Sequence, residues 1–194
     1  KDYKNNALIY KKDFTVDYSN WNSKNEGVYT VTVKLMGNYA GSHTYKYYIN
    51  DPNYLPLNTT ATHISHEYSN VKKEIFGKSV QGRNLEAFII TPSNGKYTKT
   101  FFMTFAIHGF EDSYSRDGQL LTAEGNKLVE YYAKNSKMLK NYRLVIVPCL
   151  NPDGTIAGVN NQRACSTAFG RCTAKHIDMN RDFASFQAME SRYL

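Results

Sequence analysis

Two continuous apolar runs constrain the fold of this chain more than any other feature of its sequence. FFMTFAI at residues 101–107 and RLVIVPCL at residues 143–150 are typical of strands that are buried on both faces of a sheet. Between them, apolar residues recur at helical spacing over residues 121–132, which predicts a helix that ends near the lysine- and asparagine-rich stretch at residues 134–140. Strand, helix and strand in this order predict an α/β domain with a mixed, mostly parallel sheet flanked by helices.

Three shorter segments belong to the same region. The residues from His63 to Phe76 have a helical pattern, and LEAFIIT at residues 85–91 has the apolar composition of a strand. A further short strand is predicted from His176 to Met179. We assign all of these segments to one domain, residues 53–194.

The first fifty residues have a different pattern, in which apolar and polar residues alternate. FTVDY, GVYTVTVKLM and HTYKYYIN predict three short antiparallel strands, separated by turn-rich stretches at residues 20–27 and 37–42. Three strands bury too little area to be stable alone, which favours part of a larger sandwich. The last two resemble the final strands of the immunoglobulin-like modules that are repeated on bacterial surface proteins. We therefore expect residues 1–52 to be part of a small all-β immunoglobulin-like module, with a linker at residues 51–56.

The net charge of +7 comes from 24 basic and 17 acidic residues that are spread along the chain. Because no basic stripe of the kind that binds nucleic acid is present, we expect a solvated basic surface that favours anionic substrates such as cell-wall polymers. The hydrophobic fraction of 41% predicts a globular fold, and no apolar run is long enough to span a membrane. The first residues lack the apolar stretch of a secretory signal, so Lys1 is not expected to be the natural start.

The chain contains three cysteines. Cys165 and Cys172 lie close enough in sequence for a short-range disulfide, although spacing alone does not decide the pairing. Cys149 lies inside an apolar run, where a cysteine behaves as a small buried hydrophobe.

Polar residues follow the predicted strands at the point where ligands gather in α/β proteins. His108 and Glu111 come directly after the first apolar run, in the pattern H-x-x-E. An imidazole and a carboxylate three residues apart can bind one cation, and this nitrogen-plus-oxygen set favours zinc over calcium or magnesium. Such two-letter patterns also occur by coincidence on protein surfaces, and His63 and His66 form a second pair at helical spacing. The position of His108 at a strand end favours the first pair.

Four motifs then follow one another in a specific order. They are GKSVQGRNLEAFIIT, the apolar run that ends in HGFED, VPCLNPDG and FGRCTAKHIDMNRDF. Together they resemble the zinc metallocarboxypeptidase family of carboxypeptidase A and its bacterial relatives, from about Tyr54 onwards. The resemblance implies a carboxypeptidase-like fold, one zinc ion with His108 and Glu111 among its ligands, and hydrolysis of peptides.

The same resemblance implies roles for four further residues. Arg171 matches the arginine that stabilises the oxyanion of the tetrahedral intermediate, and Arg83 matches an arginine that lines the substrate groove. Asn180 and Arg181 match the pair that holds a substrate carboxylate, a role that suits the planar guanidinium fork. Arg163 is an alternative to Arg171, and ordinary surface ion pairs are the alternative reading of Arg171 and Arg181.

The family also has a second zinc-binding histidine and a glutamate general base, downstream of the Asn–Arg pair. Only thirteen residues follow Arg181 here, and His176 precedes the pair. We therefore expect the front part of a longer, truncated domain that is inactive by itself.

The expected protein is an extracellular zinc metallopeptidase, secreted or associated with the cell wall, that hydrolyses an amide next to a substrate carboxylate. The substrate is either the C-terminal residue of a peptide or the stem peptide of bacterial peptidoglycan, and the surface-module resemblance favours the second. The rival hypothesis is a non-catalytic surface-binding or adhesive protein built on the peptidase fold.

Overall fold

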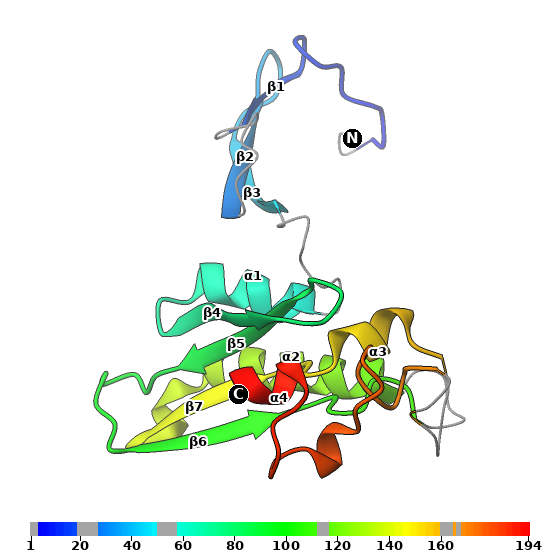
Figure 1. Ribbon diagram of the computed structural model, residues 1–194. Helices are drawn as coiled ribbons and strands as arrows, with labels where there is room; N and C mark the ends of the chain where they lie inside the picture. Colours follow the sequence, from blue (N-terminus) through cyan, green and yellow to red (C-terminus); the bar gives the residue numbers. More distant parts are fainter. Residues whose placement is uncertain (1–3, 19–26, 50–57, 112–116, 160–164, 166–167) are drawn as a thin grey trace. The chain divides into compact units, whose positions relative to one another are not determined.

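The computed structural model describes residues 4–18, 27–49, 58–111, 117–159, 165 and 168–194 (Figure 1). The chain divides into two compact units, Lys1–Pro52 and Asn53–Leu194. The linker expected at residues 51–56 and the first of the two expected turns, apart from Gly27, lie outside the described residues. In the described part of the chain, no helix has the length and apolar character needed to cross a bilayer.

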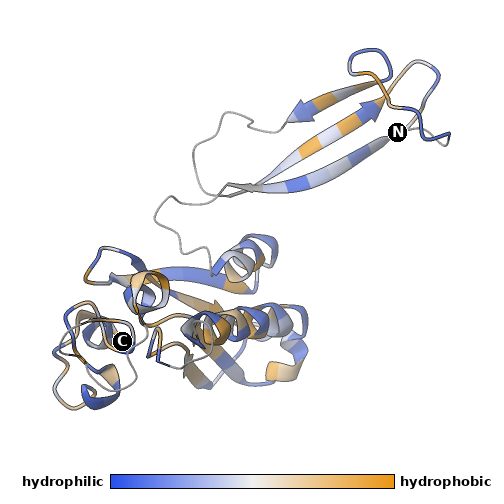
Figure 2. Ribbon diagram, turned by 90° about the vertical axis from the view of Figure 1, so that its right-hand side faces the viewer, coloured by the Kyte–Doolittle hydropathy of each residue, from blue (hydrophilic) through white to orange (hydrophobic). Residues whose placement is uncertain are grey.

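The first unit is an antiparallel sheet of three strands, as the alternating pattern predicts. The strands are β1 (Phe14–Tyr18), β2 (Gly27–Leu35) and β3 (Ser42–Ile49), with β2 in the centre. Figure 2 shows hydrophobic and hydrophilic residues interspersed along these strands. None of the side chains described between Lys4 and Tyr47 is buried, which agrees with the small area that three strands can cover. The immunoglobulin-like identity of this unit stays a prediction.

The second unit contains a mixed sheet of four strands in the order β4-β5-β7-β6. The strands are β4 (Val71–Lys78), β5 (Asn84–Ile90), β6 (Lys99–Thr104) and β7 (Tyr142–Val147). β4 and β5 pair antiparallel, as do β5 and β7, whereas β6 and β7 are parallel. The expectation of a mostly parallel sheet is therefore wrong for the described strands, because the segment before β6 is a hairpin rather than a further crossover.

Helices flank this sheet, as expected for an α/β unit. They are α1 (Thr59–Glu67), α2 (Asp117–Lys134), the 3₁₀ helix η2 (Ser136–Leu139), α3 (Pro152–Ala157), the 3₁₀ helix η3 (Met179–Arg181) and α4 (Met189–Tyr193). The long helix α2 is the crossover that connects β6 to β7, so the predicted strand–helix–strand unit is confirmed.

Two local predictions are wrong. The helical pattern from His63 to Phe76 holds only for α1, which ends at Glu67, and Val71–Lys78 forms β4 instead because it pairs with β5 along its length. His176–Met179 is not a strand: His176 lies in a turn with a positive φ of 62°, and a 3₁₀ helix begins at Met179. In both cases, contacts with distant segments outweigh local sequence preference.

The core lies on both faces of the sheet. On one face, Phe88, Ile90, Leu144 and Ile146 pack with residues of α1 and α2 such as Val129. On the opposite face, the alternate strand residues pack with the C-terminal segment; this cluster contains Ala87, Val147, Leu150, Met179 and Ala188. The C-terminal segment is therefore part of the core.

β6 differs from the other strands of its sheet. Phe101 and Phe102 are 53% and 46% exposed, so the predicted burial of residues 101–107 on both faces is wrong for the first part of the run. The reason is topological: among the described strands, β6 pairs with β7 alone and forms an edge. Only its carboxyl end, beyond Met103, reaches the interior of the unit.

Candidate metal and substrate site

The candidate site lies beyond the carboxyl ends of β6 and β7, which meet at one edge because the two strands are parallel. The chain segments after these strands remain paired: Leu150 and Asn151 donate their backbone N–H groups to the carbonyls of Phe105 and Ala106 at 3.0 and 2.9 Å. This pairing holds the loop that carries His108 beside the start of α3.

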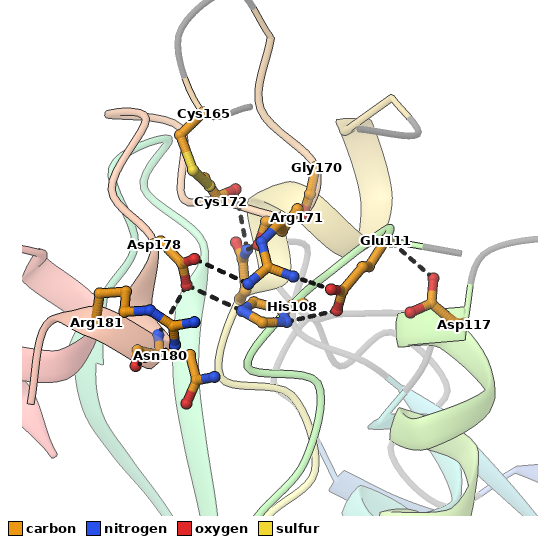
Figure 3. A network of polar contacts seen from close by, with 11 residues as sticks. His108, Glu111, Asp117, Cys165, Gly170, Arg171, Cys172, Asp178, Asn180 and Arg181 are labelled. Carbon is orange, nitrogen blue, oxygen red and sulfur yellow. Dashed lines mark hydrogen bonds and ion pairs between the residues drawn. A yellow bond between two sulfur atoms is a disulfide. The ribbon is translucent and has the colours of Figure 1, made fainter. Parts of the chain in front are cut away.

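The side chains of His108 and Glu111 converge (Figure 3). Nδ1 of His108 lies 2.6 Å from Oε2 of Glu111, and the opposite ring nitrogen, Nε2, lies 3.1 Å from Oδ1 of Asp178. Asp117, at the first residue of α2, accepts a hydrogen bond of 2.9 Å from the backbone N–H of Glu111. The imidazole is thus held between two carboxylates from different segments of the chain.

Arg171 faces the same two carboxylates. Its guanidinium forms ion pairs with Glu111 and with Asp178, the second at 2.9 Å (Figure 3). Burial disfavours the charged form of Asp178, but the hydrogen bonds from Arg171 and His108 outweigh burial and lower the pKa of this carboxyl group below its usual value. Asp178 is therefore ionised at neutral pH and joins the arginine to the histidine.

The residues present fit a zinc ion. Two ligand atoms on a tetrahedral zinc at 2.0–2.1 Å lie about 3.3 Å apart, so Nδ1 of His108 and Oε2 of Glu111 need to separate by less than about 1 Å to admit the ion. A histidine that binds metal through one ring nitrogen usually donates its other N–H to a carboxylate, and Asp178 occupies that position at Nε2. This geometry leaves Nδ1 of His108 and the carboxylate of Glu111 as the two atoms that would bind the metal.

Asp178 was not among the residues proposed from sequence. It comes two residues before Asn180 in HIDMNR, and its carboxylate also caps η3 by accepting the backbone N–H of Asn180 at 3.0 Å. Its contact with His108 joins residues 70 positions apart, which no local pattern reveals. The signal that could have identified it is the presence of an acidic residue two positions before the Asn–Arg pair.

Asn180 and Arg181 lie at the border of this cluster, where both are exposed (Figure 3). They belong to η3, and one guanidinium nitrogen of Arg181 donates to the carbonyl of Asn180 at 3.1 Å. An exposed amide and an exposed guanidinium beside the charged cluster can receive a carboxylate from solvent.

Arg83 has a different environment from Arg171. Its guanidinium pairs with the buried carboxylate of Asp153 at 2.7 Å and with Gln81 at 2.5 Å. Asp153 also accepts hydrogen bonds from the hydroxyl of Ser79 and the backbone N–H of Gln81. These bonds tie the turn between β4 and β5 to α3, and a contact of Arg83 with substrate stays a prediction.

The structure decides the pairing that spacing left open, and the predicted burial of Cys149 is confirmed. Cys165 and Cys172 form a disulfide, and their sulfur atoms lie within 4.8 Å of the carboxylate of Asp178. Cys149 is free and buried, and burial raises the pKa of its thiol. The alternative oxyanion residue, Arg163, lies outside the described residues.

The second histidine pair lies on α1, where burial, followed by the proximity of His66, lowers the pKa of His63. In the part of the chain that the structure describes, neither histidine belongs to a cluster of three potential metal ligands.

Three backbone segments meet at the site without intervening side chains. A methyl group added at Gly109, in the loop of the histidine, would lie 2.2 Å from the backbone of Gly154 in α3. A methyl group at Gly154 would lie 2.3 Å from the carbonyl oxygen of Gly170, which precedes Arg171. Such distances are far inside van der Waals contact, so the close approach of these segments requires glycine.

A mixed sheet flanked by helices, with polar side chains gathered beyond the carboxyl ends of two parallel strands, defines the broad class of α/β proteins that bind ligands at that edge of the sheet. Comparison with known proteins narrows this class. The zinc carboxypeptidase family model matches residues 57–192, and the chain belongs to this family.

Individual relatives are similar to parts of the chain. Bacteriocin BCN5 of Clostridium perfringens is 38% identical over 116 residues, which are 59% of this chain and 12% of the relative. Carboxypeptidase D of Anas platyrhynchos is 39% identical over 70 residues, 34% of this chain and 5% of the relative. A metallo-carboxypeptidase structure from Burkholderia cenocepacia shares the fold, with a TM-score of 0.50 and 16% identity over 92% of this chain and 43% of that one. The chain thus spans a small part of these curated relatives and less than half of the solved structure.

Proposed function

We propose that this chain supplies the first half of the active site of a zinc carboxypeptidase, with Nδ1 of His108 and the carboxylate of Glu111 as two ligands of one zinc ion. The observation that carries the proposal is the convergence of these two atoms while Asp178 holds the opposite ring nitrogen. Bound zinc supplies a Lewis acid that polarises the scissile carbonyl and lowers the pKa of its water.

The other residues of the cluster have roles that their positions support. The guanidinium of Arg171 lies beside the proposed ligand Glu111, where it can donate to the oxygen that becomes negative as the amide is attacked. Asn180 and Arg181 are exposed next to this point and would hold the substrate carboxylate, so that the amide nearest that carboxylate is presented for cleavage.

For the substrate, we favour the stem peptide of bacterial peptidoglycan over ordinary peptides. The support is a similarity to a protein named as a bacteriocin, and a net charge of +7 that attracts an anionic polymer. The Cys165–Cys172 disulfide favours an extracellular or cell-wall location, because disulfides persist in oxidising compartments.

One observation favours a second candidate, a non-catalytic binding protein on the same fold. Arg171 forms ion pairs with both Glu111 and Asp178, so each of these carboxylates already has a cationic partner without a metal ion. In that case Asn180 and Arg181 would bind a carboxylate ligand without cleaving it.

Zinc analysis of the protein at its natural length, before and after His108→Ala, distinguishes the two. His66→Ala is the matched control, because His66 is an exposed histidine of the same unit and belongs to the alternative pair. We expect about one zinc ion per chain in the wild type and in His66→Ala, and loss of that zinc in His108→Ala.

Digestion of defined muropeptides and of ordinary peptides by the same three proteins then tests the activity and its substrate. Cleavage that disappears with His108→Ala supports the enzyme, and the cleaved class names the substrate. Zinc-free wild-type protein that binds muropeptides without cleaving them would establish the binding protein instead.

A further inference from the structure

We propose that Asn151 is a positioning residue, which holds the segment that carries Arg171 against the loop that carries the proposed zinc ligands. The inference rests on the proposed function of Arg171 as the donor to the oxyanion. None of the contacts described for Asn151 involves the carboxylates of Glu111 or Asp178. Its effect on the reaction is therefore exerted through the backbone that carries Arg171.

The side chain of Asn151 is fully buried and all of its polar atoms are used. Its amide nitrogen donates to three successive carbonyls, those of Gly170, Arg171 and Cys172, at 3.4, 3.3 and 3.1 Å. Its amide oxygen accepts the backbone N–H of Gly154 at 3.0 Å and thereby caps α3. One side chain thus joins the end of β7 and the start of α3 to the backbone on both sides of Arg171.

The same backbone segment is held from the other side by the loop of the metal ligands. The carbonyl of Gly170 accepts the N–H groups of Gly109 and Phe110, both at 3.0 Å, and these residues lie between His108 and Glu111. The carbonyl of Gly170 is therefore shared between the Asn151 amide and the ligand loop. A shift of the segment would change the position of Arg171 relative to Glu111.

Asparagine is the side chain that this position requires. An aspartate has nearly the same shape and could still cap α3 through its oxygen, but it would place a carboxylate against three carbonyl oxygens and lose the donors. Asn151→Asp thus separates the cap from the contact with the Arg171 segment. A group that stabilises a transition-state charge is sensitive to small displacements, since a shift of about 1 Å can cost about 100-fold in rate.

The chain offers a matched control in Asn126. This second buried asparagine lies in α2, donates to the carbonyl of Thr122 at 2.8 Å and accepts the N–H of Ala61 at 2.9 Å, so it serves the α1–α2 contact. Asn126→Asp makes the same chemical change in the same unit, away from the site. Comparison of the two variants removes the effect of destabilisation alone.

The first measurement is backbone amide hydrogen exchange in the 194-residue chain, which requires neither zinc nor activity. We expect the amides of Gly109 and Phe110 to lose at least about tenfold protection in Asn151→Asp and to keep it in Asn126→Asp. Asn151→Ala serves as a second variant in case the aspartate disrupts folding. Unchanged protection of these two amides in a folded Asn151 variant overturns the proposal.

The second measurement is steady-state kinetics of the protein at its natural length, on the substrate that the digestion experiment identifies. We expect kcat to fall about 100-fold in Asn151→Asp while KM changes less than about threefold, and both to stay near wild type in Asn126→Asp. Equal losses of kcat in the two variants would show that Asn151 has only a general structural role, which overturns the proposal. If the wild type cleaves nothing, the proposed function fails by that result, whereas the exchange measurement still decides whether Asn151 holds the Arg171 segment.

Discussion

Two carboxylates at the two ends of η3 have opposite surroundings. Asp178 precedes the helix, is partly exposed and has charged or ionisable partners, Arg171 and His108. Asp182 follows the helix, is 2% exposed and, in the part of the chain that the structure describes, accepts hydrogen bonds from neutral donors. These are the hydroxyls of Ser185 and Ser191 and the backbone N–H groups of Gln187 and Ala188.

These surroundings indicate a structural role for Asp182 and a functional role for Asp178, although the two residues stand within five positions of the chain. Burial disfavours the charged form of Asp182, but its neutral donors outweigh burial and lower its pKa to about 2. These donors lie within the nine residues that follow, so Asp182 folds the C-terminal segment onto itself. Asp178 contacts Arg171, seven residues before it, and His108, 70 residues before it, and so gathers ionisable groups that can act on a ligand. A carboxylate whose donors are all neutral indicates a structural role, and one with ionisable partners, of which one comes from a distant segment, indicates a site.

Removal of the Asp182 carboxylate is expected to have the largest effect on stability in this comparison. Asp182→Ala should lower the free energy of unfolding of the second unit by about 3 kcal/mol, because four donors lose their acceptor and two of them belong to buried residues. Urea unfolding followed by circular dichroism measures the change. Ser185→Ala removes one donor and keeps the carboxylate, so a comparable loss in that variant would contradict the assignment.

A smaller effect on stability is expected when the pH is lowered. The pKa of Asp182 is lower in the folded state than its ordinary value of 3.8, so its contribution to stability is complete above about pH 4 to 5 and is lost as the pH falls towards 2. We expect the urea midpoint of the wild type to fall more steeply than that of Asp182→Ala between pH 4 and pH 2. Parallel curves for the two proteins would show that other groups cause the acid sensitivity.

The smallest change in stability is expected at Asp178. Asp178→Asn keeps the shape and should lower the free energy of unfolding by about 1 kcal/mol, because the amide oxygen can still accept from Arg171, which keeps its ion pair with Glu111. The same substitution should weaken zinc binding about 10- to 100-fold, since the histidine loses its carboxylate partner. Competition with a fluorescent zinc chelator measures the affinity. A stability loss as large as that of Asp182→Ala, with zinc affinity unchanged, would reverse the two assignments.

Sequence patterns predict the parts of this molecule that depend on neighbours along the chain. The crossover from β6 to β7 follows from two apolar runs and one helical period, and the Cys165–Cys172 disulfide agrees with a short separation. His108 and Glu111 could be selected because a three-residue spacing brings both side chains to one side of a loop.

The features that the sequence could not predict depend on partners that lie far away along the chain. The strand at Val71–Lys78 is defined by its pairing with β5, and the exposure of Phe101 depends on which strand lies beside it. Asp178 and Asn151 were missed for the same reason, because each acts through groups more than eighteen positions away. The local sequence around such a residue does not name the distant partner that the fold brings to it.

The backbone contacts between Gly109, Gly154 and Gly170 determine how this site can vary among related proteins. Where two segments are separated by side chains, a change on one segment is absorbed by rotamer adjustment before it reaches the other. Here the peptide groups abut directly, so any displacement of one segment is transmitted at full size to the next. New specificity at this site is therefore expected to arise from exposed side chains such as Asn180 and Arg181. Changes in the three backbone segments that carry these glycines are not expected to produce it.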